Sequence, residues 1–413
     1  MTQTNNDILP DSEIYGEYDD IKPGWQPVLD DILRTCNPES DHHIEYLIAS
    51  LIKEYLLSND HGAAAVFARR FDEIYGTVYK PKFDGYRRSK KGWTGYLTIF
   101  YELLFRTAVQ IQYDDPKQEK VIELLVELGK LPSRPAKIFV SSEFEWVDSR
   151  VWSSYPLLSE ELSGLDPGEM SLDFFGDLTI PENLLSLKRD SADYVNYHAF
   201  NARCIAAGMD AASKDRFQGE AHRISVGLDP GVLDYKEPEI DCQVMAAAQY
   251  IVLAGDVIYA ECVKKQLPPY RFGWKGWKHS SGPSIWKHWS AKLIEIADAL
   301  ERGGDPGFKI LEGNREALTE MVIKARDKML ALEPELLAQS EPRSVEEARP
   351  AEEATSTAEA APTTQDSQVP AAAGSTTERP HSETPVTSSA PASSNLINTY
   401  TALVWNFARN IWK

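Results

Sequence analysis

Apolar residues recur at helical spacing through much of this chain. Between residues 41 and 57 they follow one another at intervals of three and four, which places them on one face of a helix. These residues are Ile44, Leu47, Ile48, Leu51, Ile52 and Tyr55. Similar patterns predict further helices over residues 63–78, 94–113, 116–131, 193–209, 239–265, 283–302 and 314–332. The pattern therefore predicts a mainly α, irregular multi-helix domain.

Several positions refine this picture. The helix over 94–113 is apolar nearly all round, which is typical of a central helix. Asp115 and Pro116 read as an N-cap and first helical residue, with Gln118 at the capping-box position. In the helix over 63–78, the residues predicted to face inward are Val66, Phe67, Phe71 and Ile74. Residues 133–192 have no clean helical period, and the run KIFVSSEFEWV at 137–147 is the one fair candidate for a strand.

The stretch 271–300 is the most distinctive in the chain. Four of the ten tryptophans fall within it, at positions 274, 277, 286 and 289. Its first half is a glycine-broken basic loop and its second half an amphipathic helix. One interpretation is an aromatic-lined pocket or a peptide groove in which a histidine acts as acid or base. The other is that the tryptophans belong to the core and the histidines lie in solvated loops. The candidate ligand or interaction surface consists of Trp274, Trp277, His279, Trp286, His288 and Trp289.

Composition changes near the C-terminus. Residues 338–394 contain no aromatic side chain and are rich in Ala, Ser, Thr, Pro and Glu, so we expect a disordered linker. Residues 395–413 then form a predicted amphipathic docking helix. Its apolar face holds Leu396, Tyr400, Leu403, Val404, Phe407 and Ile411. A linker of about 57 residues spans roughly 40 Å as a random coil, so this helix reaches its own domain, a partner or a membrane surface.

Net charge and cysteine content limit the possible partners and the cellular compartment of this protein. The formal net charge is −20, which argues against nucleic acid as a partner because a broad basic face is absent. The basic loop Arg87, Arg88, Lys90 and Lys91 is a nuclear localisation signal, a phosphate-binding loop or a solvated loop. Residues 1–24 read as a flexible acidic arm with no secretory signal. No run of eighteen apolar residues occurs, so no transmembrane helix is expected. The four cysteines form no C-x-x-C pair. We expect a cytoplasmic or nuclear protein with free, buried thiols, neither secreted nor transmembrane.

No catalytic motif of known chemistry is present, and we expect no cofactor and no metal. His42, His43 and Glu45 lack further ligands at metal spacing. The acidic cluster Glu143, Glu145 and Asp148 lies in a poorly patterned segment, and acid–base chemistry needs a carboxylate separation that spacing alone does not supply. Cys204 lies in an apolar helix, and His198 falls on a different face of it, so a structural cysteine is the favoured interpretation over a nucleophile.

The order of features over 190–335 adds a resemblance. It runs from DYVNYHAFNARCIAAG through an alanine-rich helix and PPYRFGWKGW to SIWKHWSAKLIEIADAL and ALEPEL. This order resembles a family of uncharacterised, mainly helical, intracellular proteins of filamentous fungi, a domain of unknown function. The resemblance covers about residues 25–337, and it implies a helical fold but no activity, cofactor or catalytic residue.

Taken together, these patterns favour a helical interaction or scaffold protein without enzymatic activity, whose partner is a protein. The alternative is an enzyme or small-ligand binder with an aromatic pocket near residues 271–289, accessory to fungal secondary metabolism. Peripheral membrane contact through residues 395–413 is a third interpretation.

Overall fold

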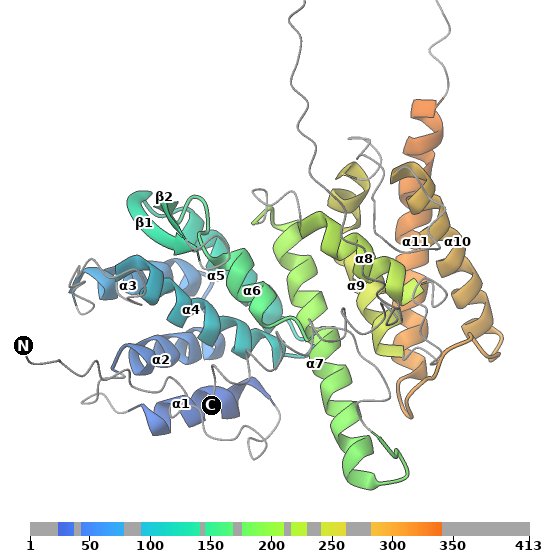
Figure 1. The fold of residues 1–413 in the computed structure, drawn as a ribbon, viewed down its shortest axis with the longest axis horizontal. Coiled ribbons are helices and arrows are strands. Elements are labelled where there is room, and N and C mark those ends of the chain that lie inside the picture. Colours follow the sequence, from blue (N-terminus) through green and yellow to red (C-terminus); the bar gives the residue numbers. More distant parts are fainter. Residues whose placement is uncertain are drawn as a thin grey trace, which may run out of the picture. The chain divides into compact units, whose positions relative to one another are not determined.

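The computed structural model describes residues 24–36, 43–77, 92–140, 145–167, 176–209, 216–228, 241–261 and 282–340. Among them lie eleven helices and one two-stranded sheet, which confirms the mainly α fold class (Figure 1). The chain divides into two compact units, and every described residue falls in the unit Asp19–Glu341. The predicted docking helix, most of the predicted linker, nearly all of the acidic arm and the basic loop lie outside the described residues.

The N-terminal group of helices packs around α4. Its members are α1 (Trp25–Thr35), α2 (His43–Leu57), α3 (Ala63–Thr77), α4 (Gly92–Val109) and α5 (Lys117–Gly129). Aromatic rings fill the space between α3 and α4, where the Phe71 ring lies 4.2 Å from that of Phe100 and 4.7 Å from that of Tyr96. The Tyr96 hydroxyl donates to the Phe71 carbonyl over 2.6 Å. The nearly all-round apolar sequence of α4 thus corresponds to a central helix.

The single strand predicted over 137–147 is replaced by parts of two paired strands and the residues that connect them. Strands β1 (Arg134–Val140) and β2 (Glu145–Val151) pair antiparallel, with Phe139 opposite Trp146. Ile138 and Val151 are fully buried on the face toward the helices, and β1 lies against α4. A short helix, α6 (Leu158–Gly164), follows. The sequence showed one strand rather than two because the segment between them contains no glycine, asparagine or proline turn signal.

The C-terminal group packs around α9. Its helices are α7 (Pro181–Ala206), α8 (Arg216–Leu228), α9 (Asp241–Tyr259), α10 (Gly282–Glu301) and α11 (Arg315–Ser340). Small residues allow close approach: a Cβ atom on Gly227 of α8 would lie 2.3 Å from the carbonyl oxygen of Gln243 on α9. Of the described helices, α9 alone is long and apolar enough to cross a membrane, but 78% of its apolar stretch is buried inside the unit. That burial is typical of the core helix of a globular domain.

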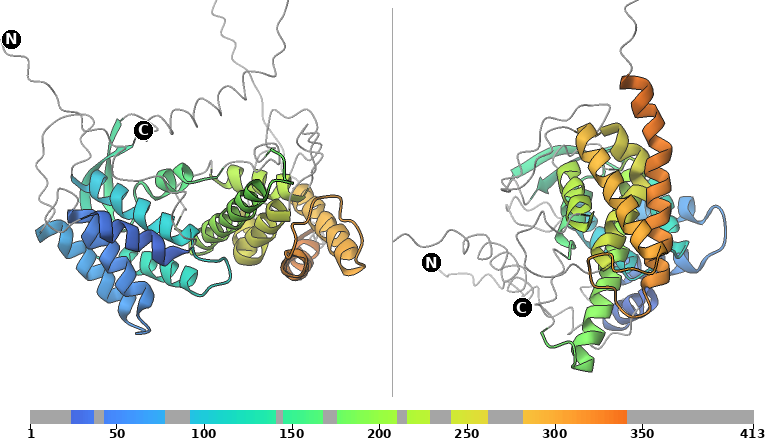
Figure 2. Two further views of the ribbon diagram at one scale, coloured as in Figure 1. Left: turned by 90° about the horizontal axis from the view of Figure 1, so that it is seen from below. Right: turned by 90° about the vertical axis from the view of Figure 1, so that its right-hand side faces the viewer.

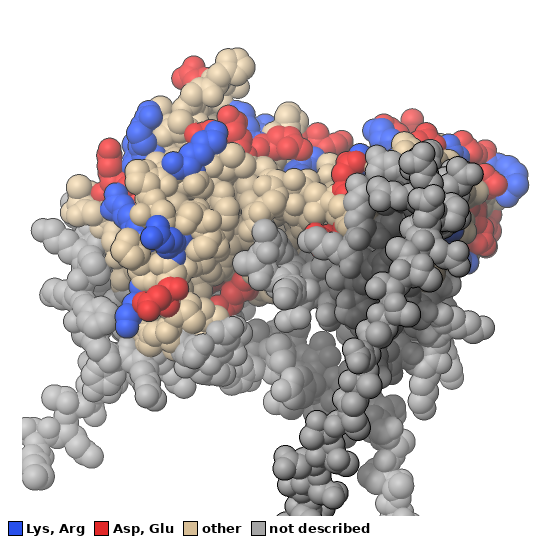
Figure 3. Space-filling view, turned by 90° about the horizontal axis from the view of Figure 1, so that it is seen from above, with Lys and Arg blue, Asp and Glu red and all other residues tan. Residues whose placement is uncertain are grey.

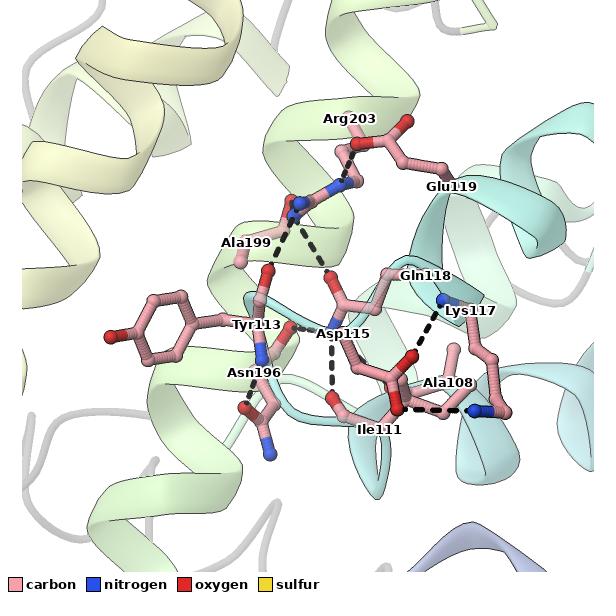
Figure 4. Close-up of polar contacts among 10 residues, drawn as sticks. All are labelled: Ala108, Ile111, Tyr113, Asp115, Lys117, Gln118, Glu119, Asn196, Ala199 and Arg203. Carbon is pink, nitrogen blue, oxygen red and sulfur yellow. Dashed lines mark hydrogen bonds and ion pairs between the residues drawn. The ribbon is translucent and has the colours of Figure 1, made fainter.

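The two groups meet on α7, which contacts α4 and α5 on one side and α9 on the other (Figure 2). Figure 4 shows the polar part of this joint. The buried Gln118 amide donates to the carbonyls of Ile111 (2.9 Å) and Asn196 (3.2 Å). Arg203 of α7 donates to the Gln118 Oε1 at 3.0 Å and to the Tyr113 carbonyl at 2.9 Å.

This joint corrects the predicted capping box. Gln118 does not turn back to cap its own helix, because its amide satisfies carbonyls where α4 ends and on α7. Asp115, the predicted N-cap, does serve the helix start, because its Oδ1 accepts from the amide of Lys117, the first residue of α5, at 2.8 Å. A buried amide with all its bonds made is a structural link rather than a reactive group.

Three further predictions needed correction. Val66 is 45% exposed, because the buried stripe of α3 runs through Ala64, Phe67, Ala68 and Phe71 and leaves Val66 to one side. Helix α7 begins at Pro181, twelve residues before the predicted start, and proline at a first helical position is the signal that marks it. Helix α11 continues past Pro334 to Ser340 instead of ending before Glu333.

Candidate functional site

The helical half of the tryptophan stretch lies in the core. Trp286 and Trp289 on α10 are both 0% exposed. The Trp286 ring meets Tyr259 of α9 at 5.1 Å, and the Trp289 indole donates to Ser225 Oγ on α8 at 3.0 Å. These two indoles therefore hold α8, α9 and α10 together and line no accessible surface. His288 lies on a different side of α10 and is half-buried.

The other members of that predicted surface are outside the described residues: Trp274, Trp277 and His279. The same holds for the basic loop Arg87, Arg88, Lys90 and Lys91 and for the docking-helix residues Leu396, Tyr400, Leu403, Val404, Phe407 and Ile411. The loop half of the tryptophan stretch thus stays a prediction.

The acidic cluster, the cysteines and the predicted absence of a metal site can be compared with the described structure. Asp148 is exposed on β2, and Glu143 lies outside the described residues, so the acidic cluster forms no described carboxylate pair. Cys36, Cys204 and Cys242 are free and buried, as predicted for these three positions. Within the described ranges, no group of three or more His, Cys, Asp or Glu side chains could hold a metal ion.

A buried polar cluster, which we call the His198 cluster, lies between α7, α8 and α9. The His198 Nδ1 and the Tyr250 hydroxyl share a hydrogen bond of 3.0 Å, and Asn201 Nδ2 donates to the same hydroxyl at 2.8 Å. Arg223 of α8 donates to both carboxylate oxygens of Asp166 at 3.0 Å. The sequence concealed this cluster because 52 residues separate His198 from its hydroxyl partner.

Electrostatics make His198 unusual. The ring is 1% exposed, and its Nε2 has no hydrogen-bond partner among the described residues. Burial, together with the positive charge of Arg223, lowers the pKa of His198 well below its ordinary value of 6.5. The ring is therefore neutral at physiological pH. A neutral imidazole beside a phenol can bind or relay a proton, but this ring is almost completely shielded from solvent.

A shallow surface groove of about 710 Å³ runs along α11. It is lined by Arg315, Glu316, Thr319, Glu320, Ile323 and Lys324. The lining comes from one helix face with both signs of charge and no aromatic ring, so it offers little to orient a ligand.

The outer face of the β-hairpin carries an aromatic pair, of which Trp146 is exposed and Phe139 is half-buried. Phe139 and Trp146 face each other across the strands with ring centroids 5.5 Å apart, and Trp146 is 37% exposed. On the same face Lys137 lies opposite Asp148, and Pro135 lies opposite Arg150. Figure 1 shows the hairpin projecting beyond α4, and Figure 3 shows a broad uncharged area on this side of the unit.

The base of the hairpin is held firmly. Asp72 of α3 forms an ion pair with Arg134 and accepts the Trp152 indole N–H at 2.9 Å, just beyond the end of β2. The Phe139 amide donates to Thr94 Oγ1 on α4 at 3.0 Å. The Phe139–Trp146 pair is therefore held by several contacts at the base of the hairpin, which lowers the entropic cost of binding through it.

These features define a mainly helical domain with a projecting aromatic hairpin. Residues 101–293, from the middle of α4 into α10, match the profile of the family described as Protein of unknown function (DUF3632). The match spans a little under half of the 413 residues and includes the hairpin, the His198 cluster and the joint on α7. It confirms the resemblance to a domain of unknown function. No curated protein and no solved structure matches the chain.

Proposed function

We propose that this chain is a cytoplasmic or nuclear protein-interaction module whose contact surface is the outer face of the β-hairpin. The pair formed by the exposed Trp146 and the half-buried Phe139 carries the proposal. Aromatic side chains dominate the binding energy of protein interfaces, where they contribute a large area at a small entropic cost. The protein partner supplies an apolar patch that covers both rings.

The rest of the described structure supports a binding role over a catalytic one. The indoles of Trp286 and Trp289 are packed inside the core, and the polar joint at Gln118 has its hydrogen bonds made. Helices α3 and α4 thus hold one small sheet. A rigid scaffold that carries a variable or protruding element is a common arrangement in binding proteins.

Site-specific photocrosslinking tests this proposal in cells that express the chain. A photoreactive amino acid at position 146 is expected to yield a defined protein adduct. The combined substitution Phe139→Ala and Trp146→Ala is expected to abolish capture of the same protein by the tagged chain. Leu185→Ala is the matched control, because Leu185 is a large apolar side chain 70% exposed on α7, away from the hairpin in sequence. Equal capture by all variants would refute the hairpin as the contact surface.

A further inference from the structure

The backbone of β2 has an open hydrogen-bonding side. Because the Phe139 amide donates to Thr94, it points away from β2, so Phe139 and Trp146 form a non-hydrogen-bonded pair. Pro135, which has no amide hydrogen, also lies in a non-hydrogen-bonded pair, opposite Arg150. The N–H and C=O groups of Trp146, Asp148 and Arg150 therefore point outward from β2.

These outward groups are largely without partners. Among the described residues, only the Arg150 carbonyl accepts a hydrogen bond, from the amide and hydroxyl of Ser154. Helix α4 covers the corresponding side of β1, where Thr94 takes up the Phe139 amide. An exposed strand edge of this kind is a template for pairing with another strand, and a hairpin of two strands is only marginally stable in water.

The charged side chains along the β2 edge of one copy are complementary to those of a second copy. If two copies of β2 pair antiparallel about a twofold axis at Ser149, Asp148 of one copy lies directly opposite Arg150 of the other, and the reverse pair forms by symmetry. Both residues carry outward backbone groups, so the Arg150 amide of one copy can donate to the Asp148 carbonyl of the other, whereas the Arg150 carbonyl stays with Ser154. Opposite charges directly across an antiparallel ladder stabilise it.

We propose that two copies of this chain pair through their β2 edges into a four-stranded antiparallel sheet. This inference deepens the proposed function and rests on it, because the joined sheet presents two Phe139–Trp146 pairs on one continuous face. The pairing is isologous, as in most homodimers. The contact is short, so the dimer is weak and depends on concentration.

Charge reversal on the purified full-length chain tests the pairing. The natural chain is expected to show a monomer–dimer equilibrium in sedimentation velocity. Asp148→Arg alone and Arg150→Asp alone each place like charges opposite one another twice, and each is expected to raise the dissociation constant by roughly tenfold or more. Both positions are exposed, and unchanged circular dichroism and melting temperature verify that the variants fold.

Mixing the two single variants provides the decisive result. In a mixed dimer every Arg faces an Asp, so an equimolar mixture is expected to dimerise although neither variant does so alone. A natural chain that stays monomeric at all concentrations overturns the inference and leaves the proposed function standing, since crosslinking at position 146 is measured separately. A dimer that neither charge reversal weakens also overturns it, because another surface then forms the contact.

Discussion

Replacing Asp193 by asparagine is expected to stabilise the protein above pH 6 and to have little effect at pH 4. Asp193 lies on α7, where its carboxylate accepts from Gln110 Nε2 at 2.9 Å. Burial raises its pKa from 3.8 to about 6, against the opposing effect of the Gln110 hydrogen bond. The folded state therefore binds a proton more readily than the unfolded chain does.

The sign and size of the change in the free energy of unfolding follow from this difference in pKa. Since the folded-state pKa is the higher one, the contribution of Asp193 to stability is fully present below pH 4 and is lost as the pH rises through 6. A difference of about two pH units corresponds to roughly 3 kcal/mol of lost stability at neutral pH. Asparagine keeps an acceptor for Gln110 and carries no charge, so we expect a gain of about 2 kcal/mol.

Urea denaturation at pH 4, 5.5 and 7.5 measures the effect, as the free energy of unfolding of Asp193→Asn minus that of the natural chain. Asp190→Asn is the matched control, because its carboxylate lies one turn earlier on α7 and is 38% exposed. The control is expected to change stability by less than about 0.5 kcal/mol. A gain from Asp193→Asn that is absent at pH 7.5, or that is equal at all three pH values, would refute the reasoning.

Three further substitutions probe the C-terminal group of helices. Gly227→Ala forces a Cβ within 2.3 Å of the α9 backbone and is expected to lower the melting temperature sharply, whereas Gly164→Ala, with open space around it, is expected to be neutral or stabilising. Trp289→Phe removes the hydrogen bond to Ser225 and part of a fully buried ring, and chemical denaturation is expected to show a loss of about 2 kcal/mol or more. His198→Gln removes a ring that is neutral in the fold and protonated in the unfolded chain below pH 6.5, so its stability is expected to fall less than that of the natural chain between pH 7.5 and 5.5.

Local periodicity was enough to predict most helices and the central position of α4. A helix with one apolar face must bury that face, so the spacing of residues such as Ile48, Ile52 and Tyr55 already specifies which side is inward. The errors are also local in origin. Val66 is apolar but lies beside the stripe, and the start of α7 is polar enough to hide its helical period.

Tertiary structure alone decided which polar groups meet. Nothing in the sequence indicates that Gln118 reaches Asn196, or that Asp72 holds both Arg134 and Trp152, since these partners lie tens of residues apart. Hydrogen-bond partners of buried groups depend on the path of the whole chain, because each buried donor or acceptor must find whichever group the fold brings near.

The tryptophan stretch and the hairpin show most clearly what the sequence predicts and what only the tertiary structure decides. The sequence by itself predicted an amphipathic helix that carries Trp286 and Trp289, but only the packing of α8, α9 and α10 revealed that both indoles are buried. The strand pattern around Phe139 and Trp146 was visible as alternation, whereas their exposure depends on α4 covering one side of the hairpin only. Periodicity is a property of neighbours along the chain, and exposure is a property of what the rest of the fold leaves uncovered.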